Sequence, residues 1–105
     1  MFDTDTVVLP KSVHKVLSRL TGQSRSDIAL SLAIKDLVRL RVIETQTRIS
    51  EFEKKYGMTF SEFEEACKNG TIHDPYSYEV EKDDFEWEAA VTDLETLEEI
   101  SQWLV

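Results

Sequence analysis

The N-terminal part of the chain constrains the fold most, because it contains more apolar side chains than so short a segment can bury by itself. Residues 4–10 are rich in β-branched residues and end at a proline, which is typical of a short strand. Apolar residues from Val13 to Leu20 then recur at helical spacing, Gly22 can end that helix, and an apolar run continues to Ile43. A lone strand is an unpaired edge. We therefore expect two copies to pair strands over shared helices, as an obligate homodimer.

The side chains of this segment divide into an inward and an outward set. Alternate residues of a strand point to opposite faces, so Val7 and Leu9 share one face and Val8 lies on the other with the threonines. The dimer core that we expect combines the inward strand residues with apolar helical positions: Val7, Leu9, Val13, Leu17, Ile34 and Leu37.

The second helix is expected to begin with Ser24 as its N-cap and Asp27 at the third helical position, as in a capping box. Apolar residues crowd positions 28–43 more densely than one helix face requires, so we expect burial on two sides. The pattern is interrupted at residues 45–48 and then resumes. We therefore expect the helix to run on unbroken to Gly57.

The order of these elements resembles a ribbon-helix-helix domain over about residues 4–43. The resemblance lies in Val7-Val8-Leu9-Pro10, the turn at residues 21–27 and the apolar helix after it. It implies that a two-stranded ribbon enters a DNA major groove, while the start of the second helix holds a phosphate. Val8 departs from the basic residue that the family often has there, so no bidentate contact to guanine is expected. The implied DNA-binding residues are Thr4, Thr6, Val8, Ser24, Arg25 and Ser26.

The formal net charge of −9 is divided unevenly along the chain. Residues 1–48 carry eight Lys/Arg and five Asp/Glu, a net +3, whereas residues 49–105 carry four and sixteen, a net −12. Opposite signs indicate two roles. We therefore expect a dimerisation and DNA-binding domain at 1–48 and an acidic helical partner-binding region at 49–105.

The acidic region has its own helical signals. Thr59 and Glu62 have capping-box spacing and predict a short helix. Residues 71–84 have no clear period, and residues 73–78 are expected to form an extended or turning connector. The segment 85–104 is predicted to be helical, with an apolar stripe that includes Trp87 opposite an acidic face.

The acidic region is similar to the C-terminal part of antitoxins of type II toxin–antitoxin modules. The similar stretches are Glu53–Glu64, Tyr76–Glu79 and Asp84–Glu88. The resemblance implies a basic, nuclease-like toxin as partner, whose phosphate-binding surface an acidic segment complements. Aromatic residues anchor such interfaces, although the same aromatics could instead pack the region against its own dimer. The expected toxin-binding residues are Tyr76, Tyr78, Phe85, Trp87, Leu94 and Trp103.

No catalytic or metal-binding pattern is present in the sequence. It lacks a phosphate-binding loop, a nucleophile elbow and zinc-ligand spacing, and Cys67 lies on an apolar stripe. We expect no enzyme activity, no metal and no cofactor. A single cysteine and the absence of a long apolar stretch or a basic leader favour a cytoplasmic protein without a membrane partner.

Together these patterns predict a mainly α protein with an N-terminal ribbon, which acts as an antitoxin-like inhibitor of a basic toxin and could repress its own operon through operator DNA. The first alternative is a ribbon-helix-helix transcription regulator with a C-terminal ligand or oligomerisation domain and no toxin. A second alternative is a helical dimer that serves as a scaffold, which requires the acidic region to fold without a partner.

Overall fold

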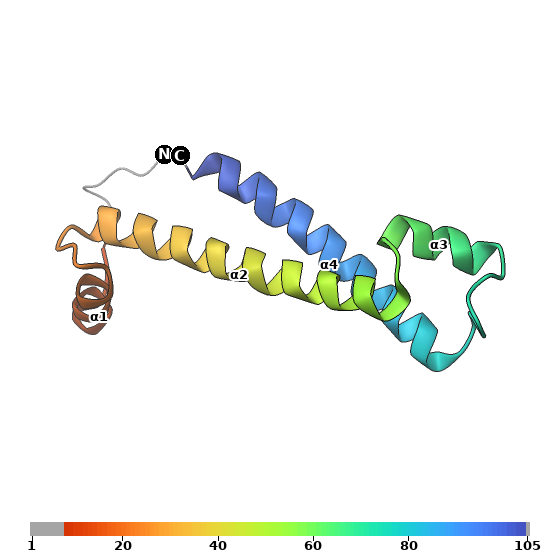
Figure 1. Ribbon diagram of the computed structural model, residues 1–105. Coiled ribbons are helices and arrows are strands. Elements are labelled where there is room, and N and C mark those ends of the chain that lie inside the picture. Colours follow the sequence, from red (N-terminus) through yellow and green to blue (C-terminus); the bar gives the residue numbers. More distant parts are fainter. Residues whose placement is uncertain (1–7, 105) are drawn as a thin grey trace. The chain divides into compact units, whose positions relative to one another are not determined.

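The computed structural model describes residues 8–104 and contains four helices in that range (Figure 1). The helices are α1 (Lys11–Thr21), α2 (Ser26–Tyr56), α3 (Phe60–Lys68) and α4 (Tyr78–Trp103). The described chain divides into two compact units. The first unit comprises residues 8–40 and 100–104, and the second is Arg41–Glu99. Helices α2 and α4 therefore each contribute residues to both units.

The predicted N-terminal ribbon is not found, and the ribbon-helix-helix fold is wrong for the described chain. Residues 8–10 belong to no strand, and α1 begins immediately after Pro10. Four of the predicted strand residues, Thr4, Asp5, Thr6 and Val7, lie outside the described residues. A strand needs a neighbouring strand for its backbone hydrogen bonds. Residues 8–104 offer none, so the described fold is all-α.

In the first unit, Gly22 ends α1 as predicted. It adopts a left-handed φ of 72°, and its N–H donates to the Ser18 carbonyl at 2.8 Å. The predicted start of the second helix is displaced, because α2 begins at Ser26 and the Ala29 N–H donates to the carbonyl of Arg25, not of Ser24. Arg25 and Asp27 instead form an ion pair across the first turn.

Helix α2 is continuous over 31 residues, so the predicted unbroken helix up to Gly57 is confirmed. The polar residues 45–48 include neither glycine nor proline, and a helix tolerates them at small cost. The helix ends at Gly57, where φ is 67° and the N–H donates to the Glu53 carbonyl at 2.7 Å.

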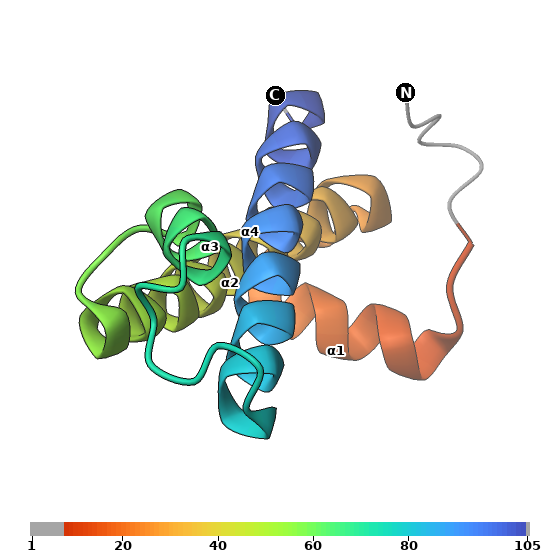
Figure 2. The ribbon, with the colours of Figure 1, turned by 90° about the vertical axis from the view of Figure 1, so that its right-hand side faces the viewer.

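The core of the second unit joins α2, α3 and α4 (Figure 2). Phe63 of α3 and Trp87 of α4 are completely buried, with ring centroids 5.0 Å apart, and Val80 completes the centre. Partly buried side chains surround them: Phe52, Tyr56, Met58, Phe60, Cys67, Ile72 and Val91. Because a nine-residue helix is marginal alone, α3 depends on this packing.

Two N-terminal caps set the boundaries of α3 and α4. The predicted capping box is confirmed: the Glu62 N–H donates to Thr59 Oγ1 at 3.3 Å, and the Thr59 N–H donates to Glu62 Oε1 at 2.8 Å. Helix α4 starts seven residues before the predicted Phe85, because the Val80 N–H donates to Ser77 Oγ at 3.2 Å. Residues 78–84, in which the sequence shows no clear period, are therefore helical.

Candidate partner-binding surface

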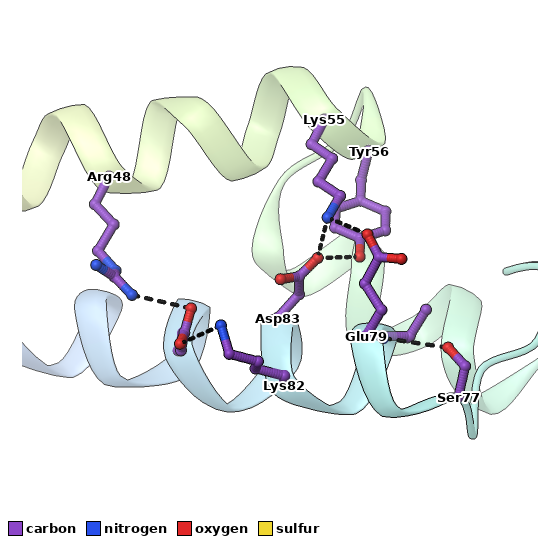
Figure 3. A network of polar contacts seen from close by, with 9 residues as sticks. Arg48, Lys55, Tyr56, Ser77, Glu79, Lys82 and Asp83 are labelled. Carbon is purple, nitrogen blue, oxygen red and sulfur yellow. Dashed lines mark hydrogen bonds and ion pairs between the residues drawn. The ribbon is translucent and has the colours of Figure 1, made fainter.

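A polar clasp fixes the first turns of α4 against the end of α2 (Figure 3). Lys55 Nζ lies 2.6 Å from Asp83 Oδ2 and 2.8 Å from Glu79 Oε1. The Tyr56 hydroxyl donates to the same Asp83 oxygen at 2.5 Å. Asp83 is only 7% exposed, and a buried charge is costly unless it is paired. Two donors from α2, Lys55 and Tyr56, compensate it. This clasp places the opposite face of α4 in solvent.

The protonation states of the clasp are fixed over the physiological range. Burial and the hydrogen bond to Asp83 raise the pKa of Tyr56 to about 12. Burial acts to raise the pKa of Asp83, but the hydrogen bonds from Lys55 and Tyr56 outweigh it and hold that pKa below its usual value. The same ion pairs raise the pKa of Lys55. The pKa values of Lys55, Tyr56 and Asp83 are all shifted away from neutrality, so these three groups stabilise the packing of α4 on α2 rather than exchange protons.

A second pair of contacts lies one turn further along α4. Glu86 forms an ion pair with Arg48 of α2 at 3.0 Å and one with Lys82 of its own helix at 2.9 Å. These interactions hold the pKa of Glu86 below its usual value, chiefly through the hydrogen bond from Lys82. With the clasp, they fix which side of α4 faces α2.

The opposite side of α4 presents an exposed row of side chains, which we call the acidic stripe. Its residues alternate at spacings of three and four, so they line one helix face. Every member is exposed, and Phe85 is 75% and Tyr78 80% accessible. The acidic stripe consists of Tyr78, Glu81, Phe85, Glu88, Thr92, Glu95 and Glu99.

The charge of the second unit is largely uncompensated. Residues Arg41–Glu99 contain six Lys/Arg and seventeen Asp/Glu, a net charge of −11. Four of the six basic residues are already in ion pairs with carboxylates of this unit. Thirteen carboxylates take no part in an ion pair within the described residues. The unit therefore presents a surface of strongly negative potential.

The six expected toxin-binding residues do not form one surface. Tyr76 is exposed (84%) in the connector, Tyr78 and Phe85 lie on the acidic stripe, and Trp103 (76% exposed) belongs to the first unit. Leu94 is half-buried on the core side of α4. Trp87 is 0% exposed within the aromatic core, so it offers no accessible surface to a partner. Of the six, the structure brings Tyr76, Tyr78 and Phe85 to the exposed surface of the second unit.

Residues expected in the dimer core are only partly covered by their own chain. Leu9, Leu17 and Ile34 are half-buried, whereas Val13 is 47% and Leu37 51% exposed. Val7 lies outside the described residues. Helix α1 has no buried residue, and its exposed apolar face forms a shallow groove of about 320 Å³. The groove is lined by Ser12, Val13, Val16, Leu17 and Leu20.

The expected DNA-binding residues are not assembled by the described structure. Val8 is 86% exposed but outside any strand, and Thr4 and Thr6 lie beyond the described range. Ser24 is exposed in the turn before α2 and Ser26 is the first residue of that helix. The guanidinium of Arg25 contacts both carboxylate oxygens of Asp27, at 3.2 and 2.9 Å. DNA binding stays a prediction.

The glutamates of the acidic stripe are the surface residues that the sequence reasoning did not single out. In the sequence these residues are three and four positions apart, on the helix face opposite the apolar stripe. The pattern can be recognised once α4 is known to begin at Tyr78. No family model, curated protein or solved structure matches the chain. In residues 8–104, no group of three acidic, histidine or cysteine side chains is arranged for a metal, and no helix could cross a membrane.

Proposed function

We propose that the protein is a dimeric, cytoplasmic, antitoxin-like inhibitor that binds a basic protein through the acidic stripe of α4. The observation that carries the proposal is the stripe itself, an exposed helix face with four glutamates and two aromatic side chains. A nuclease-like toxin has a positive surface for phosphate groups, and a row of carboxylates on a rigid helix is complementary to it.

The aromatic members of the stripe support protein binding rather than simple solvation. Phe85 and Tyr78 sit two turns apart on the stripe with most of their surface accessible, and Tyr76 is nearby in sequence. Large aromatic side chains bury much area at little entropic cost, which makes them frequent interface anchors. Exposing them without a partner is unfavourable.

The acidic region is proposed to bind as a preformed unit. Its core includes side chains from α2, α3 and α4, and the Lys55–Asp83 clasp fixes α4 internally. Binding therefore does not require this region to fold, and the associated entropy cost is avoided. Inhibition would follow when the stripe covers the positive surface that the partner uses for its substrate.

Dimerisation is proposed to occur through α1 and the first half of α2. In that half, apolar residues occupy all sides of the helix, a pattern that is stable only when the helix is covered. Six exposed large apolar side chains of α1 and the first half of α2 add up to roughly three complete side chains per protomer, worth about 5–9 kcal/mol if buried. These side chains are Val13, Val16, Leu20, Leu32, Leu37 and Leu40.

The inhibitor function is tested by co-purifying the full chain with the product of the adjacent gene. The variant Glu81→Gln/Glu88→Gln/Glu95→Gln removes three charges from the stripe and should weaken the complex at least tenfold. The control Glu51→Gln/Glu53→Gln/Glu65→Gln changes the net charge equally at exposed positions off the stripe and should bind as the wild type does. No binding of the wild type, or equal weakening by both variants, would refute the proposal.

The dimer is tested by sedimentation. The double variant Val16→Glu/Leu20→Glu places two charges on the exposed face of α1 and should give a monomer. The matched variant Gln23→Glu/Gln46→Glu adds the same charge at exposed polar positions and should stay dimeric. A monomeric wild type, or a Val16→Glu/Leu20→Glu dimer as tight as the wild type, contradicts this surface.

A second candidate is a dimeric scaffold, and the internally packed core of the acidic unit is the observation that favours it. A scaffold would not inhibit the adjacent gene product. Measuring the activity of that product with and without a stoichiometric amount of the full chain separates the two functions.

A further inference from the structure

A cavity of about 240 Å³ lies beside the N-terminal end of the acidic stripe, within the second unit. Three segments form it: the last turn of α3, the connector and the first two turns of α4. Its lining combines apolar and aromatic walls with charged groups. The lining residues are Cys67, Lys68, Pro75, Tyr76, Val80, Glu81 and Asp84.

The connector holds one wall of the cavity in place. Asp74 has a φ of 50°, an uncommon conformation for a residue with a side chain, and its carbonyl accepts from the Ser77 N–H at 3.1 Å. Pro75 and Tyr76 lie between these two residues, so the turn directs them to the cavity. Tyr76 keeps 84% of its surface accessible and can still cover an incoming group.

Asp84 is the one lining carboxylate with a covered oxygen that has no partner. Its Oδ1 is shielded from solvent and accepts no hydrogen bond within the described structure. Burial raises the pKa of Asp84, and the nearby charge of Glu88 raises it further. A positive charge held in the cavity beside this carboxylate stabilises its charged form.

The remaining charges of the lining favour a cation. Glu81 and Asp84 stand against the single ammonium of Lys68, which forms no ion pair in the described structure. An anion would meet two carboxylates, and an apolar group would leave Asp84 without a donor. Cys67 contributes a neutral thiol, because burial raises its pKa.

We propose that this cavity receives an arginine side chain of the basic protein partner, with Asp84 as its charge partner and Tyr76 stacked on the guanidinium plane. The inference rests on the proposed function and names what the second unit recognises. A guanidinium presents a planar fork of donors, is weakly hydrated and stacks on aromatic rings. A lysine ammonium is a more strongly hydrated point charge and suits a partly apolar cavity less well.

The test is an NMR titration of the full ¹⁵N-labelled chain with the peptide acetyl-Ala-Arg-Ala-amide. We expect saturable shifts centred on Cys67, Tyr76 and Asp84. The same peptide with citrulline, which has the shape of arginine without its charge, should bind at least tenfold more weakly. Shifts that spread along the acidic stripe without saturation at the cavity would overturn the inference.

Two variants separate the cavity from general acidity. Asp84→Asn should weaken the arginine peptide at least tenfold, while Glu53→Gln, an equal charge change on α2, should leave binding unchanged. Equal weakening by both would overturn the inference. Alkylating Cys67, the only cysteine of the chain, with iodoacetamide gives an independent check on the native sequence. The added group occupies the cavity and should abolish peptide binding, and retained binding would contradict the assignment.

The outcome for the cavity is distinguishable from the outcome for the inhibitor function. If the adjacent gene product binds wild type and Asp84→Asn equally, the inhibitor proposal stands and the arginine cavity is refuted. If the arginine peptide binds in the cavity but the adjacent gene product does not bind, the cavity stands and that partner is refuted.

Discussion

The substitution Asp83→Ala tests whether the clasp between α2 and α4 holds the second unit together. The carboxylate accepts a hydrogen bond from Lys55 at 2.6 Å and one from Tyr56 at 2.5 Å, and it is almost completely buried. Removing it eliminates both interactions and leaves the Tyr56 hydroxyl without its acceptor. The same change removes the only cross-helix partner that Tyr56 has in the described hydrogen bonds.

The expected loss is about 2 kcal/mol of unfolding free energy. A neutral hydrogen bond contributes about 1 kcal/mol, and one to a charged group contributes somewhat more. The Lys55 interaction has to be discounted, because its side chain is 44% exposed and solvent screens the pair. With a denaturant slope of about 2 kcal/mol per molar urea, the unfolding midpoint should fall by about 1 M.

The measurement is urea unfolding followed by tryptophan fluorescence at a fixed protein concentration. Trp87 is buried in the core of this unit and reports its unfolding, while Trp103 is largely exposed already and can be replaced by phenylalanine in the background. Fixing the concentration matters because dimerisation would contribute to the apparent stability.

The pH dependence of the unfolding midpoint gives a second test of the clasp. The pKa of Asp83 in the folded protein lies below its usual value, so its stabilisation is present above about pH 4 and is lost as the pH falls through the folded-state pKa. The midpoints of wild type and Asp83→Ala should therefore converge below pH 4. Equal midpoints at pH 7, or a gap that does not narrow in acid, would refute the role of the clasp.

Three further predictions concern single side chains. Ser77→Ala should remove the N-cap of α4 and cost about 1 kcal/mol in urea unfolding, and an unchanged midpoint would contradict the cap. The folded-state pKa of Tyr56 is about 12, so the wild type should lose stability as the pH rises from 10 to 12, a loss that Tyr56→Phe should lack when both are followed by circular dichroism. Trp87→Ala should cost about 3–5 kcal/mol and collapse the methyl dispersion in a one-dimensional NMR spectrum, whereas retained dispersion would exclude Trp87 from the core.

Local chemistry made several helix boundaries predictable. Gly22 ends α1 in the expected left-handed conformation, and the Thr59–Glu62 box caps α3 as its spacing predicts. These signals need only a few neighbouring residues. The predicted strand was wrong for the described residues. β-branched composition is also a local signal, whereas a strand requires a second strand to pair with, and residues 8–104 contain no strand.

The start of α4 was missed although its Ser77 cap is local, because the apolar period is interrupted over the first turns of the helix. Asp83 lies on the buried face of the first turns and interrupts the apolar period there, and it is tolerated only because Lys55 and Tyr56 are brought to it from α2. The geometry of α4 also places Phe85 and Trp87 on different faces of the helix. They are two residues apart, yet one is 75% exposed and the other completely buried. Because both residues are aromatic, the sequence made both of them candidates for a partner-binding surface. Only the helix face on which each lies distinguishes them.

The uncompensated carboxylates of the second unit have opposite consequences for the free protein and for its complex. Like charges at spacings of three and four along α4 repel one another, so they destabilise the folded unit while they attract a basic protein. Added salt weakens both effects, since it screens exposed charges of either kind. Raising the ionic strength should therefore make the free protein harder to unfold and the complex easier to dissociate. The protein would be most stable alone under the conditions in which it holds its partner least tightly.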